Sequence, residues 1–374
     1  MSNSLSVLAP RLLAQGLLAL RQMSIMPRLV NNDYSALAAQ KGTTIDIPIP
    51  SAITATDVTP AATPPATGDL SPTQVQVSLD NWKEAAFQLS DKEKLEVMEG
   101  TIPMQASEAV KALANAVDQS ILAQYKGIYG YVGTAGTTPF TALTSADASS
   151  LRSVLNKQLA PLSDRRAVID PDAEAMALNV RAFQDMSFSG NAQAIIEGAL
   201  NRKLGFDWWM DQNVPTHTKG VAGTILIDQA DVAVGDTEVH LDGGTTTASV
   251  GDIFTVAGDT QTYTVLTASA LATADFDITF APAAKVAWAN DAAVTFKASH
   301  VVNLGFHRDC FAFASRPLVD EDGLGNIIQS AADPVSGLVM RLEISREHKR
   351  TRYAYDILWG TKLVRPELGA RLAG

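Results

Sequence analysis

The longest stretch of helical periodicity, from Thr101 to Tyr131, constrains the fold more than any other feature of the sequence. Pro103 suits a first helical turn, and Gly127 and Gly130 mark the end of the helix. Apolar residues recur along the stretch at steps of three and four: Val110, Leu113, Val117, Ile121, Tyr125 and Ile128. This pattern predicts one helix of about 25 residues, about 38 Å long. A single long helix between strand-rich segments indicates a structural strut, because catalytic groups usually sit on loops.

A second, amphipathic helix is predicted close to the N-terminus. Its apolar stripe consists of Leu12, Leu13, Leu17 and Leu20. That stripe must be covered by another part of the chain or by another copy of it. The segment lacks a basic start, and Arg11, Gln15 and Arg21 interrupt it, which argues against a signal peptide or a membrane span. We therefore expect the protein to be made and kept in a reducing cytoplasm.

Two alternating strands joined by a Pro-rich segment predict a long two-stranded arm. Residues 44–50 (TIDIPIP) and residues 75–79 alternate at the period of a strand, and the second strand leads to Trp82. The apolar positions are Ile45, Ile47, Ile49, Val75, Val77 and Leu79. Pro48 and Pro50 cannot donate to a ladder, so the first strand must lie at an edge or outside a sheet. A mobile surface loop is the alternative, but an arm with apolar faces favours assembly with other copies.

An α/β unit is predicted after a glycine- and threonine-rich link. It contains a helix over residues 145–159, a strand over residues 166–169 and a further helix that starts near Asp170. The acids of residues 170–174 (DPDAE) could form a metal or acid–base cluster. The start of a helix is the favoured interpretation, because carboxylates are common in a first turn. Gly133 and Gly136 in the link lack the rest of a phosphate-loop motif.

Residues 222–299 are rich in acids and in short alternating strands. The segment holds ten Asp or Glu residues and only two lysines. Strands are predicted over residues 238–241, 253–256, 262–266, 276–280 and 294–296, with glycine-containing turns between them. This pattern predicts a small sandwich or barrel inserted into a longer unit. The whole chain has a net charge of −11, which argues against a broad electrostatic grip on nucleic acid.

The C-terminal section returns to mixed α/β character and carries the one dense basic run of the sequence. That run consists of Arg346, His348, Lys349, Arg350 and Arg352. No aromatic platform interleaves with these charges, so contact with nucleic acid is disfavoured. A solvated hairpin tip and an ion-pair site between subunits are the two interpretations that remain.

The sequence predicts no catalytic, cofactor-binding or metal-ligating residue, and hence no enzyme. It contains no Gly-x-Ser-x-Gly, His-Glu-x-x-His or Cys-x-x-Cys motif, and its five histidines are dispersed. His307 and Cys310 alone cannot complete a tetrahedral zinc site. We expect Cys310, the only cysteine, to be buried as a small apolar residue.

In its order of parts and in several short motifs, the chain resembles the major capsid protein of tailed bacteriophages. The branch concerned carries an inserted β-barrel, as in short-tailed Salmonella phages. Residues 204–207 (LGFD) and 212–215 (QNVP) resemble the family's segment ahead of the insertion. Residues 306–313 (FHRDCFAF) and 316–318 (RPL) resemble its return, and residues 358–360 (LWG) and 364–367 (VRPE) its ending.

The resemblance implies an α+β chain with the tailed-phage capsid fold, also called the Johnson fold. The implied parts are an N-terminal arm (1–42), an extended two-stranded loop (43–90), a peripheral domain (91–139) with its spine helix (102–128), an axial domain (140–221), an inserted β-barrel (222–299) and a return to the axial and peripheral domains (300–374).

The implied function is to assemble as hexamers and pentamers into an icosahedral shell around double-stranded DNA. The implied partners are further copies of the chain, a scaffolding protein and a portal, with DNA enclosed without sequence-specific binding and no membrane. The implied place is the virion, assembled in the bacterial cytoplasm. Candidate residues for contacts between subunits are Ile45, Ile47, Ile49, Val75, Val77, Trp82, Arg346, Arg350 and Arg352. Two alternatives remain: a non-viral, encapsulin-like shell protein, and an acidic β-domain that binds a ligand such as a glycan or Ca²⁺.

Overall fold

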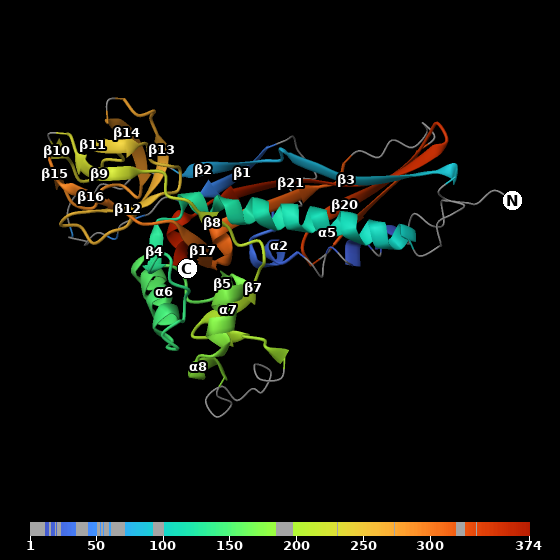
Figure 1. Cartoon of the computed structure of the whole chain (residues 1–374), viewed down its shortest axis with the longest axis horizontal. Coiled ribbons are helices and arrows are strands. Elements are labelled where there is room, and N and C mark those ends of the chain that lie inside the picture. Colours follow the sequence, from blue (N-terminus) through green and yellow to red (C-terminus); the bar gives the residue numbers. More distant parts are fainter. Residues whose placement is uncertain are drawn as a thin grey trace.

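Helix α5 (Thr101–Leu122) runs along much of the length of the molecule and continues as the 3₁₀ helix η1 (Ala123–Gly127) (Figure 1). The long helix is therefore confirmed, but its last turns are 3₁₀ and not α-helical. The computed structural model describes residues 12–14, 16–18, 20, 24–34, 44–50, 53, 55, 60, 72–92, 101–184, 197–229, 231–272, 274–318, 326–333 and 335–374.

A five-stranded sheet packs against the apolar face of α5. Val110, Leu113 and Val117 of α5 are buried in one core with Tyr355 and Trp359 of the sheet. All its strand pairs are antiparallel. Its strands are β3 (Asn81–Ser90), β18 (Phe311–Arg316), β19 (Ile327–Ala332), β20 (Val339–Glu347) and β21 (Arg350–Leu363). The last ten residues of the predicted extended loop thus form a strand of this sheet, because β3 pairs with β21 along its whole length.

A seven-stranded mixed sheet forms the second part of the body, with helices α6 (Ala146–Lys157) and α7 (Pro171–Leu178) beside it (Figure 1). Leu151 of α6 packs over Gly305, where any side chain would collide with it. The helices near residues 145 and 170 and the strand at residue 166 are confirmed. The strands are β4 (Gly130–Gly133), β5 (Arg165–Ile169), β6 (Arg202–Lys203), β7 (Phe206–Met210), β8 (Thr216–His217), β17 (His300–His307) and β22 (Gly369–Ala373). Short helices among the described residues include α8 (Arg181–Gln184), η2 (Arg308–Cys310) and η3 (Pro366–Leu368).

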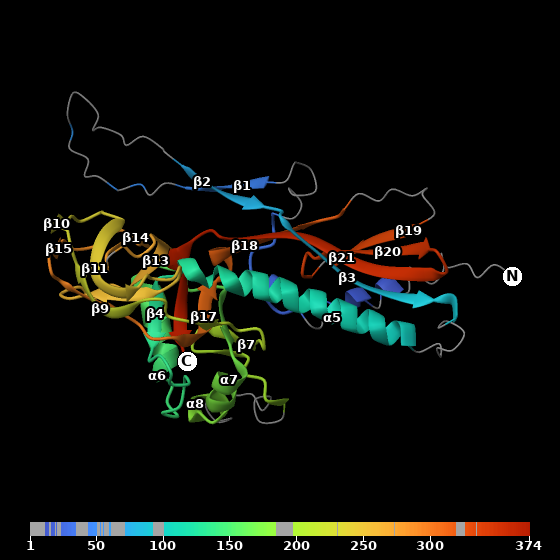
Figure 2. The ribbon, with the colours of Figure 1, turned by 45° about the horizontal axis from the view of Figure 1, so that its top comes forward.

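A closed six-stranded barrel occupies one end of the molecule (Figures 1 and 2). Its strands are β9 (Ala222–Ile227), β11 (Glu238–Thr246), β12 (Ile253–Val256), β13 (Tyr263–Ala268), β14 (Phe276–Ala281) and β16 (Ala293–Phe296), and the short pair β10 (Asp231–Val232) and β15 (Trp288–Ala289) lies outside it. The core includes Phe254, Tyr263, Phe280 and Trp288. All five predicted strands are present, and β9 is the strand that the sequence did not reveal, because only its last residues alternate between apolar and polar.

The predicted two-stranded arm is present as β1 (Thr44–Ile49) paired with β2 (Thr73–Ser78) (Figure 2). Its apolar face is covered by the same chain, because the arm packs in one cluster with Ala312, Ala314 and Val364. Most of the Pro-rich segment between the two strands lies outside the described residues.

The N-terminal leucine stripe is likewise covered within the chain. Leu12, Leu13 and Leu20 are buried in the main core, and Leu17 packs against it. Helix α2 (Met26–Leu29) follows, and Asn31 then adds to β18 through a parallel bridge to Ala312. Of the two ways to cover this stripe, the chain uses its own core.

Candidate functional site

The arm presents its polar face outward. Ile45, Ile47 and Val77 are buried against the body, whereas Ile49 and Val75 are half-buried. The exposed arm residues are Thr44, Asp46, Pro48, Thr73, Gln74, Gln76 and Ser78. Within the described residues, β1 and β2 pair only with each other. A neighbouring chain would therefore meet polar side chains and the outer strand edges. The role of the arm between subunits stays a prediction.

Trp82 is a large exposed aromatic residue at the start of β3. Its side chain is 62% exposed, yet its Nε1–H donates to Asp356 Oδ2 at 3.1 Å. Asp356 is nearly buried and also accepts from Arg341, whose Nη2 lies 2.6 Å from Oδ2. The indole is thus held in one orientation while much of its ring stays open to solvent. A fixed, exposed aromatic ring is well suited to contact another protein.

The basic run lies at the turn of the β20–β21 hairpin, where Glu347 pairs with Arg350. Its arginines bond within the chain: Arg346 to Asp91 (Nη2 to Oδ2, 2.5 Å), Arg350 to Glu347 and Arg352 to Glu84. The hairpin tip is therefore confirmed. The use of these arginines between subunits stays a prediction.

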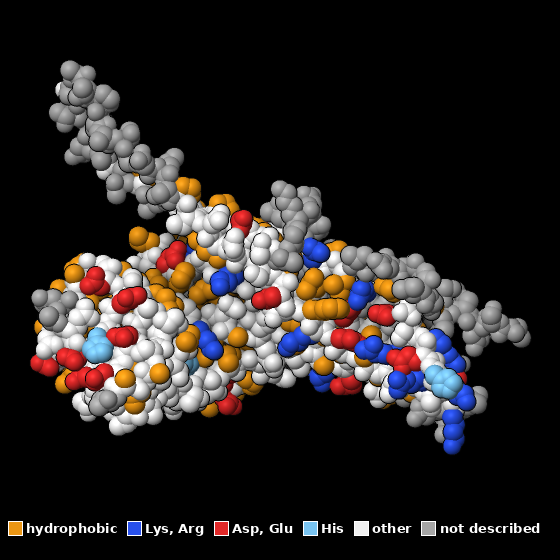
Figure 3. Space-filling view, turned by 90° about the horizontal axis from the view of Figure 1, so that it is seen from above, with side chains coloured by type: hydrophobic (Ala, Val, Ile, Leu, Met, Phe, Trp, Pro, Cys, Tyr) orange, Lys and Arg blue, Asp and Glu red, His pale blue; other side chains and the backbone are white. Residues whose placement is uncertain are grey.

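Charged side chains are unevenly distributed over the face shown in Figure 3, where acids dominate at the barrel and acids and bases are mixed at the far end. Many of the acids of residues 222–299 thus lie on the barrel surface, whereas Asp252 is buried.

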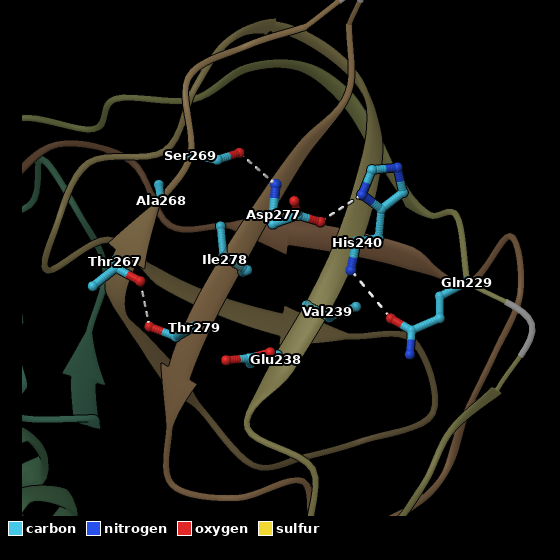
Figure 4. A pocket seen from close by; sticks show the side chains of 10 residues that line it. All are labelled: Gln229, Glu238, Val239, His240, Thr267, Ala268, Ser269, Asp277, Ile278 and Thr279. Atoms are coloured by element: carbon cyan, nitrogen blue, oxygen red, sulfur yellow. Dashed lines mark hydrogen bonds and ion pairs between the residues drawn. The ribbon is translucent and has the colours of Figure 1, made fainter.

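A polar hollow of about 470 Å³ lies on the outer surface of the barrel, over β11, β13 and β14 (Figure 4). His240 Nδ1 lies 2.6 Å from Asp277 Oδ1, and this hydrogen bond raises the pKa of the imidazole. The Glu238 side chain and the hydroxyls of Thr267 and Thr279 also line the hollow. Within the described ranges, no three His, Cys, Asp or Glu residues are placed to hold a metal ion. The lining offers hydrogen bonds and negative charge but no Phe, Tyr or Trp ring on which a sugar could stack.

A buried Tyr–His–Asp chain lies where the barrel meets the body. Tyr125 Oη is 2.9 Å from His217 Nδ1, and His217 Nε2 is 2.8 Å from Asp252 Oδ1. His217 is 4% exposed and Asp252 is 1% exposed. Burial raises the pKa of the Tyr125 phenol, so the phenol stays protonated at neutral pH. The three residues are far apart in sequence, and no local pattern pointed to them.

Cys310 is fully buried, as predicted from the sequence, and burial raises the pKa of its thiol. His307 does not act with it: its Nδ1 accepts the backbone N–H of Asp309 at 3.3 Å and caps η2. The acids after residue 169 do begin helix α7, although the Asp170 side chain makes no capping hydrogen bond. None of the helices described here combines the length and the apolar character that a membrane span requires.

The fold is shared with solved structures of phage proteins. A structure from Mycobacterium phage Che8 is 14% identical, with a TM-score of 0.53, over 93% of this chain and 90% of that one. The capsid structure of cyanophage P-SCSP1u is 13% identical, with a TM-score of 0.52, over 94% of this chain and 88% of that one. No family model and no curated protein sequence matches the chain. The likeness is one of fold, and it extends over nearly the whole length of the chain.

Proposed function

We propose that the chain is the major capsid protein of a tailed bacteriophage and that it assembles as hexamers and pentamers into an icosahedral head around double-stranded DNA. The observation that carries the proposal is the fold, which matches phage structures, one of them a capsid, over more than nine-tenths of this chain. On this proposal the chain is a structural protein of the virion and no enzyme. Its partners are other copies, a scaffolding protein and a portal, and it assembles in the bacterial cytoplasm.

The domain limits inferred from the sequence become part of this proposal. The barrel between residues 222 and 299 is the insertion, α5 is the spine helix of the peripheral domain, and the seven-stranded sheet, apart from β4, belongs to the axial domain. Support comes from the chain path, because β8 and β17 pair directly on either side of the barrel. An insertion with adjacent ends leaves the surrounding sheet intact.

Contacts between copies are proposed at two surfaces that the chain leaves open. One is the polar outer face of the arm, with its outer strand edges, and the other surrounds the Trp82 indole. An unpaired strand edge can bind another chain through backbone hydrogen bonds. A held aromatic ring provides a large contact area at a low entropic cost.

Electron microscopy of the recombinant full-length chain, with light scattering on the same sample, tests the proposal. Closed shells, or rings of five and six, are expected either from the chain alone or after its scaffolding protein is added. A chain that stays monomeric in both conditions contradicts the proposal. Nucleic acid in particles from infected cells separates a phage head from an encapsulin-like shell.

Substitution of Trp82 tests the second surface. Trp82→Ala should give a folded subunit, with unchanged circular dichroism, that no longer forms shells, and Trp82→Phe should retain assembly. Normal shells from Trp82→Ala would exclude this residue from the interface.

A further inference from the structure

The end of the long helix is completed by side chains from the barrel. The last carbonyls of a helix have no partners within the helix and must find them elsewhere. Here Lys126 O accepts the hydroxyl of Thr264 at 2.8 Å, and Tyr129 O accepts the hydroxyl of Thr262 at 2.7 Å. Thr264 is in β13, and Thr262 lies directly before that strand. The barrel therefore supplies a hydrogen-bond donor to Lys126 O within η1 and another to Tyr129 O just beyond its end.

Arg371 also joins this helix end to the barrel, through hydrogen bonds of its guanidinium group. It lies in β22 and is 0% exposed. Its Nη1 donates to Gly251 O in the barrel at 2.7 Å, and its Nη2 donates to Lys126 O at 3.1 Å. Burial lowers its pKa to about 9, so the guanidinium remains charged at neutral pH. A buried charge is tolerated only while its hydrogen bonds are intact, so this residue depends on both parts of the molecule.

The crossing from body to barrel is also held by buried hydrogen bonds. The Asp252 carboxylate accepts from His217 Nε2, from Gly220 N at 3.1 Å and from Ser249 N at 2.8 Å. Because Asp252 can only accept, His217 carries its proton on Nε2 and accepts the Tyr125 hydroxyl on Nδ1. A series of hydrogen bonds thus connects Tyr125 in η1, His217 in β8 and Asp252 in the barrel segment.

Two glycines allow the backbones to touch. Gly251 has φ +98°, and a Cβ there would lie 3.1 to 3.3 Å from atoms of Lys126. At Gly220 a Cβ would lie 2.5 Å from Ser249 N. The barrel backbone at Gly251 therefore lies directly against Lys126 at the end of the helix, and the backbone at Gly220 lies directly against Ser249.

We propose that the barrel is the C-terminal cap of the long helix and that barrel and body unfold as one cooperative unit. Modules joined through surface contacts usually unfold separately. In this protein the Lys126 carbonyl and the Arg371 guanidinium of the body form hydrogen bonds with groups of the barrel, so their separation would leave these buried groups without these partners. The inference concerns the single subunit and holds whether or not the chain forms a shell.

Two tryptophans allow the two parts to be followed separately in the full-length chain. Trp288 is in the barrel core, and Trp359 is in the core beneath α5. With 5-fluorotryptophan incorporated, the ¹⁹F signals of both residues should disappear at the same urea concentration in the wild type. Trp288→Phe and Trp359→Phe assign the two signals.

Substitutions at the junction should cause the barrel and the body to unfold at different urea concentrations. Arg371→Met leaves Gly251 O and Lys126 O without this donor. Thr264→Val changes the shape little and removes a hydroxyl that donates to Lys126 O and accepts from Arg371 Nη2 at 3.2 Å. The expected increase in the equilibrium constant for opening the junction is about tenfold for Thr264→Val and about a hundredfold for Arg371→Met. Thr264→Val keeps the test decisive if Arg371→Met fails to fold.

The matched control is Val265→Ala, in the barrel core next to Thr264. Val265→Ala should shift the urea midpoints of the Trp288 and Trp359 signals together, because it weakens the barrel core and leaves the hydrogen bonds of the junction in place. Two separate midpoints in the wild type would overturn the proposal. Coincident midpoints in the folded junction variants would overturn it as well. The measurement uses unassembled subunits, so either result is independent of whether shells form.

Discussion

Replacement of Asp118 should change how the stability of the protein depends on pH. Asp118 lies on α5 and is 1% exposed. Its Oδ2 accepts Ile25 N–H at 3.0 Å and its Oδ1 accepts Met26 N–H at 3.2 Å, which ties the N-terminal segment to the helix. Burial, followed by the nearby Asp211 carboxylate, raises the pKa of Asp118 from 3.8 to about 7, while these N–H groups and Arg28 oppose the rise.

The direction of the effect follows from proton binding. Because the pKa in the folded state lies above the unfolded value, the folded chain binds the extra proton between about pH 4 and pH 7. The free energy of unfolding therefore falls as pH rises through this window, and this contribution is lost above it. The pKa difference corresponds to about 4 kcal/mol in total, of which about 2.5 kcal/mol falls between pH 5 and pH 8.

Urea unfolding of the wild type and of Asp118→Asn between pH 5 and pH 8 measures this contribution. The amide cannot titrate and keeps only one oxygen, so Asp118→Asn should cost about 1 kcal/mol for one lost acceptor and lack the pH-dependent part. The wild type should therefore lose about 2.5 kcal/mol of stability relative to Asp118→Asn between pH 5 and pH 8. Asp147→Asn is the control, because Asp147 is less buried and also accepts a backbone N–H, from Phe140 at 2.6 Å. Parallel pH profiles for the wild type and Asp118→Asn would refute the reasoning.

Three further substitutions test the packing. Leu113→Ala, in the core under α5, should lower the free energy of unfolding by about 2 to 5 kcal/mol in urea, because it leaves a cavity. Gly360→Ala should loosen the base of the arm and increase protease cleavage there, because the new Cβ would lie 2.3 Å from Ser78 O; unchanged cleavage would contradict this. Arg352→Gln should lower the free energy of unfolding little, by about 0.5 kcal/mol or less in urea, because its ion pair with Glu84 is exposed; a larger loss would contradict this expectation.

Local periodicity was enough to predict the elements whose form depends on near neighbours. The apolar residues of α5 recur at helical spacing because one face packs on a sheet, and β14 and β16 alternate because one face lines the barrel. The 3₁₀ turn at η1 could not be predicted in this way. The groups that bond its carbonyls, such as Thr264 and Arg371, lie more than a hundred residues away.

Strand β3 shows a different reason for an incomplete prediction. Ala85, Phe87 and Leu89 do alternate, and they pack on the main core. However, β3 follows β2 after only two residues, so the sequence reads as one continuous arm. The point at which the chain leaves the arm and joins the sheet is set by pairing with β21, and that strand is far away in sequence.

The arm and the basic hairpin tip show that a sequence pattern can indicate that a partner exists without indicating which chain supplies it. Alternating isoleucines require an apolar surface, and β18 of the same chain provides it. Clustered arginines require carboxylates, and Asp91, Glu347 and Glu84 of the same chain provide them. On the proposed function, a second copy would meet groups that these contacts leave open, such as the outer edges of the arm and the indole face of Trp82. Because strand edges bind through the backbone and an indole binds through its area, assembly at these surfaces should depend less on salt than an arginine-based interface would.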